Sequence, residues 1–576
     1  MTEGAAGASS RASGARGRRF PADSLEPGID ACRWKRDASQ VGPLGVGYAP
    51  GSACGRPARR DGLCVFHAPK LSEEAKGVLA APEREEAEGL DADFRQELDT
   101  LIVGAESSDV PDPLLFTGFQ FPSFALSGQV FSMPVSFDEA RFVGPVKLSR
   151  VSFRDRTSFV GAHFCGDADF FQTEFREGIF NSAKFDGHTV FAEAAHGSLN
   201  MSNATFGGGA SFVETRIRLG LYGGTVFSGE TTFWPVTFTE AGDFQFAKFL
   251  AAAAFREVQF EQVADFSAAV FRGTTEFDRV TFQGNAEFGG SAVEGRLEFA
   301  ADDDSQCFEA GADFSNVRLD PKSVMSFERV DLSDASFLWT NIESVVFKDV
   351  RWRASERKFG PIRLTRHALA DEYQTAGVHP DYAPLSLNYR QLVRNYEAQR
   401  DYETAESFYI GEMEMQRRQL GLGRPRLAGF FRSWLNGHGL YLLLSRYGTS
   451  YMWSLAILAV LVAAISLLML GAGFRTALDA TQGGSSTSAA VTLPSISTIQ
   501  YGLWFDTEHP VAAEPRQWLR DYGRAFIFTT SILTLQRSRP YEPINSLGWL
   551  CMYLASVALV GQTALVLFAI RRRFKR

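Results

Sequence analysis

The chain has 576 residues, of which 45% are hydrophobic and 22% are charged, and its formal net charge at pH 7 is −9. This length is enough for several domains, and the mild negative charge disfavours direct binding to nucleic acid. Six cysteines in a chain of this length make no disulfide framework, which favours a reducing compartment.

Residues 1–30 are rich in Ala, Gly, Ser and Arg and have no apolar periodicity. This composition predicts a disordered N-terminus. The segment also lacks the continuous apolar core that a secretory signal requires. We therefore expect the N-terminus to remain in the cytoplasm.

Residues 31–70 contain a cysteine and histidine pattern that is typical of a zinc knuckle. Cys54 is followed by Cys64 and His67 in "CGRPARRDGLCVFH", and Cys32 precedes them. Three thiolates and one imidazole form a tetrahedral ligand set for structural zinc, and four protein ligands leave no open position for catalysis. The alternative is that these are incidental cysteines in a segment rich in loops.

Residues 71–110 are predicted to form a capping helix and a linker. The charged stretch 72–102 has Phe94, Leu98 and Leu101 on one helical face. An open first turn of a β-structure is an exposed edge, and such a helix could cover it. The β-region is expected to begin at residues 114–122.

Large apolar residues, mostly phenylalanines, recur in residues 111–352 at spacings that alternate between five and six. The cleanest run is Phe227, Phe233, Phe238, Phe244, Phe249, Phe255, Phe260, Phe266, Phe271, Phe277, Phe282, Phe288, Val293 and Phe299. A small residue often stands two positions earlier, as Ala264 does before Phe266, so both point to the same side of an extended backbone. This 11-residue period predicts a stacked solenoid with phenylalanine ladders inside.

The segment "ADFSAAVFRGTTEF" (residues 264–277) resembles the pentapeptide-repeat family. The resemblance implies a right-handed quadrilateral β-helix. Because this chain adds a residue to every second five-residue unit, a four-sided turn would need about 22 residues, with the extra residue forming a corner bulge. We expect about ten turns, with looped-out turns between Phe191 and Phe227 and between Phe299 and Phe327, where the rhythm falters.

The predicted solenoid is acidic. Residues 116–350 hold 18 Lys and Arg against 32 Asp and Glu. This excess has two interpretations, which are solubility and the electrostatic recognition of a basic partner, including mimicry of DNA.

Residues 360–446 are predicted to form a helical hairpin and a juxtamembrane region. Tyr389, Leu392 and Tyr396 would face Ala405, Phe408 and Tyr409 across a turn near Arg400 and Asp401. The hairpin resembles one tetratricopeptide-type unit, which is too little for a peptide-binding superhelix, and we expect it to pack on the end of the solenoid. Glu412 and Glu414 are interpreted as solvated charges.

Residues 450–473 and 546–570 are uncharged and long enough to cross a membrane. Arginines precede the first span and a basic tail, residues 571–576, follows the second, so the positive-inside rule places both chain ends in the cytoplasm of a multi-pass inner or plasma membrane protein. The loop 474–545 would lie outside. Its apolar part, residues 524–536, is too short to span and is expected to be interfacial or re-entrant.

Gln562 is a polar residue within the second span. It could support a homo-oligomer by bonding across a helix interface, or it could be satisfied within its own hairpin. The second alternative is favoured.

The chain as a whole resembles a bacterial membrane-anchored subgroup of pentapeptide-repeat proteins. Four segments carry this resemblance: the cysteine-rich segment, the Phe-rich repeats, "NYEAQRDYETAESFYIGEMEM" (residues 395–415) and the terminus "FAIRRRFKR" (residues 568–576). Motifs for a nucleophile, a phosphate loop or a catalytic metal are missing from the sequence. We therefore expect a non-enzymatic scaffold or sensor that binds a protein partner. The alternatives are an oligomeric pore gated by the solenoid and, with less support, a DNA-mimic modulator of topoisomerases.

Overall fold

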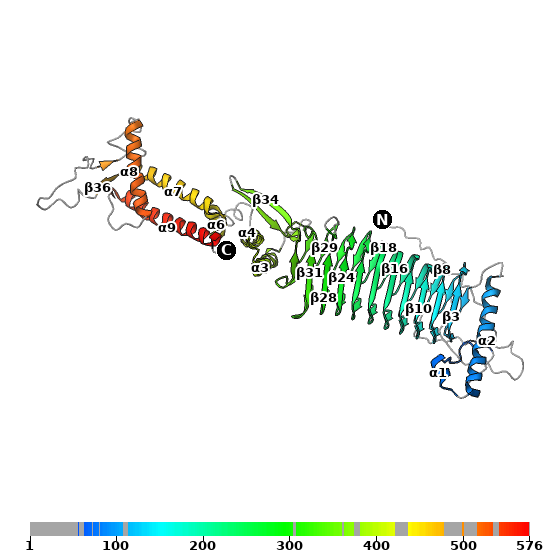
Figure 1. Cartoon of the computed structure of the whole chain (residues 1–576). Coiled ribbons are helices and arrows are strands. Elements are labelled where there is room, and N and C mark those ends of the chain that lie inside the picture. Colours follow the sequence, from blue (N-terminus) through cyan, green and yellow to red (C-terminus); the bar gives the residue numbers. More distant parts are fainter. Residues whose placement is uncertain are drawn as a thin grey trace, which may run out of the picture. The chain divides into compact units, whose positions relative to one another are not determined.

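The computed structural model describes residues 54, 56, 63–71, 73–79, 81–106, 113–302, 307–359, 362–373, 381–420, 436–476, 498–499, 515–533 and 541–574 (Figure 1). The chain divides into two compact units, Met1–Pro380 and Asp381–Arg576. The first unit holds the predicted solenoid and the second is mainly helical.

Among the residues that the structure describes before the solenoid, two segments are helical. They are α1 (Glu73–Gly77) and α2 (Ala81–Glu106), so the single helix predicted over residues 72–102 is interrupted. Phe94 is fully buried and packs edge-on against Phe121 of the first turn, with ring centroids 5.3 Å apart. The segment therefore packs on the first turn, in agreement with the predicted capping role, and Ile102 is buried where Leu101 had been expected.

The solenoid contains parallel strands that pair from each turn to the next (Figure 1). One face is a ten-stranded sheet with one strand from each of ten turns: β2 (Gln120–Phe121), β6 (Arg141–Phe142), β9 (His163–Phe164), β12 (Lys184–Phe185), β15 (Thr205–Phe206), β17 (Val226–Phe227), β19 (Lys248–Phe249), β23 (Val270–Phe271), β27 (Ala292–Val293) and β30 (Arg318–Leu319).

The remaining solenoid strands form a 23-stranded sheet: β1 (Leu114–Leu115), β3 (Phe124–Ser127), β4 (Val130–Phe131), β5 (Val135–Ser136), β7 (Val146–Ser149), β8 (Ser152–Ser158), β10 (Ala168–Phe171), β11 (Glu174–Ile179), β13 (Thr189–Ala192), β14 (Ala195–Asn200), β16 (Ala210–Leu221), β18 (Thr231–Asp243), β20 (Ala253–Arg256), β21 (Gln259–Phe260), β22 (Val263–Asp265), β24 (Thr274–Asp278), β25 (Thr281–Phe282), β26 (Ala286–Glu287), β28 (Arg296–Ala300), β29 (Ala312–Asp313), β31 (Val324–Glu328), β32 (Ala335–Ser336) and β33 (Val346–Lys348).

The core consists of four ladders of inward side chains, as the sequence predicted. In one ladder Phe244 stacks on Phe266 with ring centroids 4.7 Å apart and an interplanar angle of 1°. The other three ladders include the stacked pairs Phe249–Phe271, Phe255–Phe277 and Phe260–Phe282. Four inward residues in each turn make the solenoid four-sided.

The prediction of looped-out turns between Phe191 and Phe227 is wrong. Strands β14 and β16 continue the sheet here, and Phe191 stacks on Phe212 at 5.1 Å. The spacing of the phenylalanines is irregular here because other residues occupy ladder positions. His196 pairs with Ile217, and Tyr222 stacks on Phe244 at 4.7 Å. Between Phe299 and Phe327 the turn is longer, yet both rings still stack at 5.1 Å.

The register between neighbouring strands shifts by one residue where turns of 21 and 22 residues meet, whereas turns of 22 residues pair without a shift. The predicted corner bulge in every second unit stays a prediction. The pairing of β16 with β18 shifts between Ile217 and Leu219, and that of β11 with β8 shifts between Phe175 and Glu177. The shift absorbs one extra residue in the longer turn, because a bulge leaves that residue unpaired. The ladders therefore stay in register on both sides of it.

A hairpin and a short helix follow the last turn of the solenoid, and the second strand of the hairpin and the short helix lie in the range that was predicted to be helical. An antiparallel hairpin, β34 (Arg353–Phe359) with β35 (Ile362–Ala368), is followed by the short helix η2 (Ala370–Glu372). Trp352 lies over Phe347, with centroids 5.2 Å apart. The predicted boundary of the helical region at residue 360 is therefore too early.

The second unit begins with the predicted helical hairpin, formed by α3 (Tyr382–Ala398) and α4 (Tyr402–Gln419). Asp381 and Asp401 cap the two helices by accepting hydrogen bonds from Ala383 N and Thr404 N. Tyr396 stacks on Phe408 at 5.6 Å, so the apolar faces meet as predicted.

Three longer helices follow the short helix α6 (Gly437–Ser445): α7 (Tyr451–Ala472), α8 (Pro515–Leu533) and α9 (Ser546–Phe574). The strands β36 (Phe474–Thr476), β37 (Thr498–Ile499) and β38 (Tyr541–Pro543) form a small sheet beside them. The three long helices share an apolar core that includes Met469, Phe528 and Leu559. The apolar segment predicted at 524–536 thus belongs largely to α8.

Candidate metal centre and interaction surfaces

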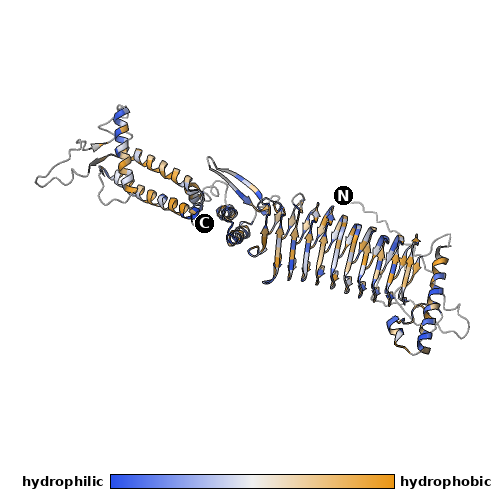
Figure 2. Ribbon diagram, viewed as in Figure 1, coloured by the Kyte–Doolittle hydropathy of each residue, from blue (hydrophilic) through white to orange (hydrophobic). Residues whose placement is uncertain are grey.

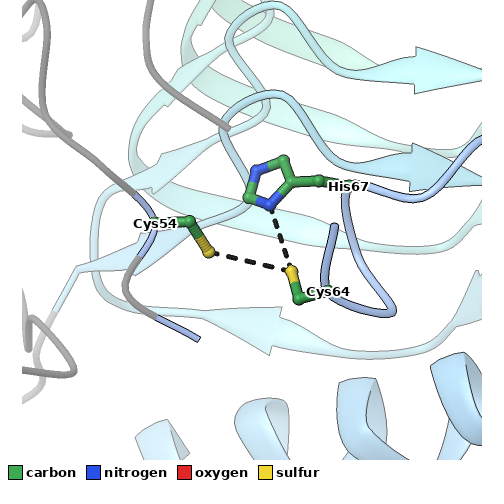
Figure 3. Close-up of side chains that lie close together, drawn as sticks. All are labelled: Cys54, Cys64 and His67. Atoms are coloured by element: carbon green, nitrogen blue, oxygen red, sulfur yellow. Dashed lines mark hydrogen bonds between the residues drawn. The ribbon is translucent and has the colours of Figure 1, made fainter. Parts of the chain in front are cut away.

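Cys54, Cys64 and His67 converge next to the first turn of the solenoid (Figure 3). The two sulfur atoms are 3.7 Å apart, and Cys64 Sγ lies 3.2 Å from His67 Nδ1. All three side chains are buried, with exposed fractions of 1%, 2% and 4%. Cys32, the fourth ligand predicted from the sequence, lies outside the described residues.

The imidazole of His67 is oriented by the solenoid itself. His67 Nε2 lies 3.2 Å from the carbonyl oxygen of Thr117, which can accept a hydrogen bond from it. A proton on Nε2 leaves the lone pair of Nδ1 available on the side of Cys64 Sγ. Metal-bound histidines are usually held by such a contact from the second nitrogen.

The donor set fits a tetrahedral metal ion. With metal–sulfur bonds of about 2.3 Å, the sulfur atoms of two thiolates at a tetrahedral angle lie about 3.8 Å apart, and the sulfur atoms of Cys54 and Cys64 are 3.7 Å apart. This separation is far longer than a disulfide bond of about 2.05 Å, so no disulfide joins the two cysteines. The sulfur–nitrogen separation would have to widen by a few tenths of an ångström on binding.

Charged side chains lie close to this cluster. Lys76 and Asp91 form a buried ion pair that joins α1 to α2. Burial lowers the pKa of Lys70 to about 8, although the nearby Asp91 and Cys64 oppose this shift.

A second group, His163, Cys165 and Asp186, lies on the surface of the solenoid and was missed in the sequence. His163 Nε2 is 2.6 Å from Asp186, and Arg141 lies 3.0 Å from His163 Nδ1. Both imidazole nitrogens thus have partners, and Arg141 and Lys184 add positive charge nearby. This group is therefore better suited to a surface hydrogen-bond network than to a cation.

An acidic column runs along one side of the solenoid. We define it as Asp243, Asp265, Glu287 and Asp313, which pair with one another in four successive turns. Burial, together with the charges of Asp313 and Asp265, raises the pKa of Glu287. The column borders a groove of about 470 Å³ whose lining includes Glu287, Asp313 and Asp334.

Glu412 and Glu414 are buried, so the interpretation of both as solvated charges is wrong. Arg390 Nε donates to Glu412 at 2.9 Å. Glu414 accepts hydrogen bonds from Arg417 at 3.0 Å and from Tyr447 at 2.8 Å. Burial opposes ionisation of Glu414, but the bonds from Arg417 and Tyr447 hold its pKa below the usual range.

These contacts connect the hairpin to the base of the apolar helices. Tyr447 lies in the turn between α6 and α7, whereas Glu414 belongs to α4. The guanidinium of Arg572, in the last turns of α9, lies 3.7 Å above the ring of Tyr409. The predicted hairpin therefore contacts the turn that precedes α7 and the C-terminal end of α9.

Helices α7 and α9 are long and apolar enough to cross a membrane, with mean hydropathy of 2.8 and 2.0 in their most apolar windows (Figure 2). Many of their apolar side chains are exposed, including Val460 at 62% and Val557 at 76%. Gln562 donates to the carbonyl oxygens of Leu444 at 3.0 Å and Ser454 at 2.8 Å. The favoured alternative is therefore confirmed for the amide nitrogen only, because Gln562 Oε1 is buried and has no hydrogen-bond partner among the described residues.

Comparison with known proteins identifies the solenoid only. Residues 126–174 and 255–301 match the family described as "Pentapeptide repeats (9 copies)". No curated protein and no solved structure shows a significant match to the chain. These matches show pentapeptide repeats within the solenoid, and the four-sided fold with its four ladders agrees with them.

Proposed function

We propose that this protein is a non-enzymatic membrane scaffold or sensor. Its solenoid would present the acidic column to a basic protein partner on the cytoplasmic side. The observation that carries the proposal is the exposed apolar surface of α7 and α9, because side chains such as Val460, Leu468 and Val557 would be unfavourable in water and suit a bilayer.

The contacts at the base of the helices support a sensing role. A ligand can shift a protein between states only if it contacts those states differently. Glu414, Arg417 and Tyr447 link α4 to the turn that begins α7, and Arg572 links α9 to α4. A displacement of the hairpin would therefore be transmitted to both membrane helices.

The rival proposal of an oligomeric pore has less support. The side-chain amide of Gln562 donates twice within its own hairpin, so it is not needed for contact between copies. Ion flux through liposomes containing the purified protein would favour the pore, and a tight bilayer would favour the scaffold.

The experiment is affinity capture from detergent-solubilised membranes with matched charge variants. The variant Asp265→Asn, Glu287→Gln and Asp313→Asn removes three charges from the acidic column. It keeps side-chain oxygens for the turn bonds that Asp265 and Asp313 accept from Ser267 N and Ser315 N. We expect the partner to be retained by the wild type and lost from this variant.

The control variant carries Glu309→Gln, Glu343→Gln and Asp349→Asn, which removes the same charge at exposed positions elsewhere. It should retain the partner. Equal capture by both variants, or the absence of any partner above background from an intact solenoid, would count against the proposal. Extraction of the chain from membranes by alkaline carbonate would contradict its membrane placement.

A further inference from the structure

We propose that Cys54, Cys64 and His67 bind a zinc ion whose role is to fasten an N-terminal cap onto the first turn of the solenoid. The inference goes beyond scaffolding, since it concerns what closes the solenoid rather than what the solenoid binds. It rests on the donor geometry and on a second set of contacts that surrounds the donors.

The first step is that residues 63–68 continue the solenoid by one incomplete turn. The carbonyl oxygen of Phe66 accepts a hydrogen bond of 2.7 Å from the backbone N–H of Gln120, at the start of β2. The ring of Phe66 stacks on Phe119 with centroids 4.3 Å apart and an interplanar angle of 18°. Phe66 thus extends the aromatic stacking one step beyond the first turn.

The second step is that this cap has little regular structure of its own. Cys64 O accepts hydrogen bonds from His67 N and Ala68 N, which form a single turn. Phe94 of α2 covers Phe66 from the outside at 5.4 Å. A short segment of this kind loses conformational entropy when it is ordered, and a metal ion that joins its ends offsets this cost.

The third step is that the ligands lie where they secure the cap. Cys64 and His67 flank Phe66 on the chain, and Cys54 approaches from a separate segment. His67 also contacts Thr117 O in the first turn. Zinc bound by these three residues would hold Phe66 against Phe119 and keep the edge groups of the first turn paired. An open edge is a site for pairing with another chain.

Zinc is favoured by the chemistry of the donors. Two thiolates and an imidazole suit a soft or borderline cation, whereas magnesium and calcium prefer oxygen ligands. The ion would act structurally, by joining Cys54 to the segment that holds Cys64 and His67.

The test uses the full chain, purified in detergent under reducing conditions without added metal. Elemental analysis should give one zinc per chain in the wild type. Cys54→Ser and Cys64→Ser should lose most of it, whereas Cys165→Ser, a partly exposed thiol on the solenoid, should retain it. His67→Cys supplies an alternative zinc ligand and should restore binding that His67→Ala loses.

Hydrogen exchange measured by mass spectrometry distinguishes a cap from an incidental metal site. Treatment of the wild type with a chelator should raise exchange at Gln120 and in residues 63–70 by about tenfold or more, while β23 to β30 stay unchanged. Added zinc should reverse the effect. Substoichiometric zinc in reduced protein, or unchanged exchange at Gln120 after zinc removal, would overturn the proposal.

Discussion

Two buried tyrosines show how differently the two units use polar groups in their cores. Tyr222 stands in a solenoid ladder, and within the described part of the chain its hydroxyl group has no hydrogen-bond partner. Tyr447 stands at the base of α7 and donates to Glu414 at 2.8 Å. In the solenoid, ring stacking between turns determines the position of the side chain. At the helical junction, the hydrogen bond to Glu414 determines the position of Tyr447. Replacing each tyrosine with phenylalanine should therefore have opposite effects on the stability of the two units.

The largest effect is expected at the helical junction. Arg417→Met would leave Glu414 buried with less counter-charge, which should destabilise the packing of α4 on α6 by about 3–5 kcal/mol. Hydrogen exchange in α4 and α6 would measure it. Arg390→Met is the control, because Arg390 is half exposed and its loss should cost less. Equal effects of the two variants would show that burial of the pair is unimportant.

Tyr447→Phe removes only the hydroxyl group and should destabilise the same junction by about 1–3 kcal/mol. The pKa of Glu414 should rise in this variant, because one of the hydrogen bonds that stabilise the carboxylate is lost. Exchange in α4 and α6 as a function of pH would show both changes. Unchanged hydrogen exchange in α4 and α6 would show that the Tyr447 hydroxyl group does not stabilise the junction, and Tyr447 would then not differ from Tyr222 in this respect.

His196 extends the comparison to a titratable group in the solenoid core. Burial lowers its pKa to about 3 in the folded chain, so the folded state binds no proton here at pH values where the unfolded state does. The contribution of neutral His196 to stability is complete above the unfolded pKa of about 6.5 and is lost as the pH falls towards 3, by up to about 1.4 kcal/mol per pH unit.

His196→Phe should therefore remove this part of the acid sensitivity, since a phenylalanine suits the stack on Phe175. The measurement is the unfolding free energy of the solenoid at pH 7, 6, 5 and 4 in both proteins. His188→Asn, at an exposed position, is the control and should leave the pH profile unchanged. Parallel profiles for His196→Phe and the wild type would contradict the prediction.

The smallest effect has the opposite sign to that of Tyr447→Phe. Tyr222→Phe should stabilise the solenoid by about 1 kcal/mol, because it removes a buried hydroxyl group without a partner and keeps the ring. Phe266→Tyr, two rungs further along the same ladder, should destabilise it. Thermal unfolding of the solenoid would measure the stability of both variants. A Tyr222→Phe variant that is less stable than the wild type would contradict the prediction that the buried hydroxyl group is unfavourable.

The solenoid could be predicted because its signal is local and repeated. The spacing of Phe244, Phe255 and Phe266 fixes both the period and the inward face. The looped-out turns were wrongly predicted because Ile217, Tyr222 and His196 can occupy ladder positions, and only the register of neighbouring turns reveals this. A search for any large side chain at the expected position would have found them.

The buried charges and the cap depend on contacts between distant residues. Glu414 is polar and lies in a charged helix, so its sequence neighbours indicate exposure, whereas its burial depends on Tyr447, more than thirty positions later. The spacing of Cys54, Cys64 and His67 predicted a ligand set. It gave no indication that Phe66 would stack on Phe119, because that contact joins separate segments.

The one-residue bulge at β16 and β18 has a consequence for how such a protein could change in length. A turn can gain or lose a residue while the ladders on either side keep their pairing. Whole turns of about 22 residues could likewise be added or deleted, each changing the solenoid by one strand spacing of about 4.8 Å. The number of turns would then determine the length of the solenoid in fixed increments.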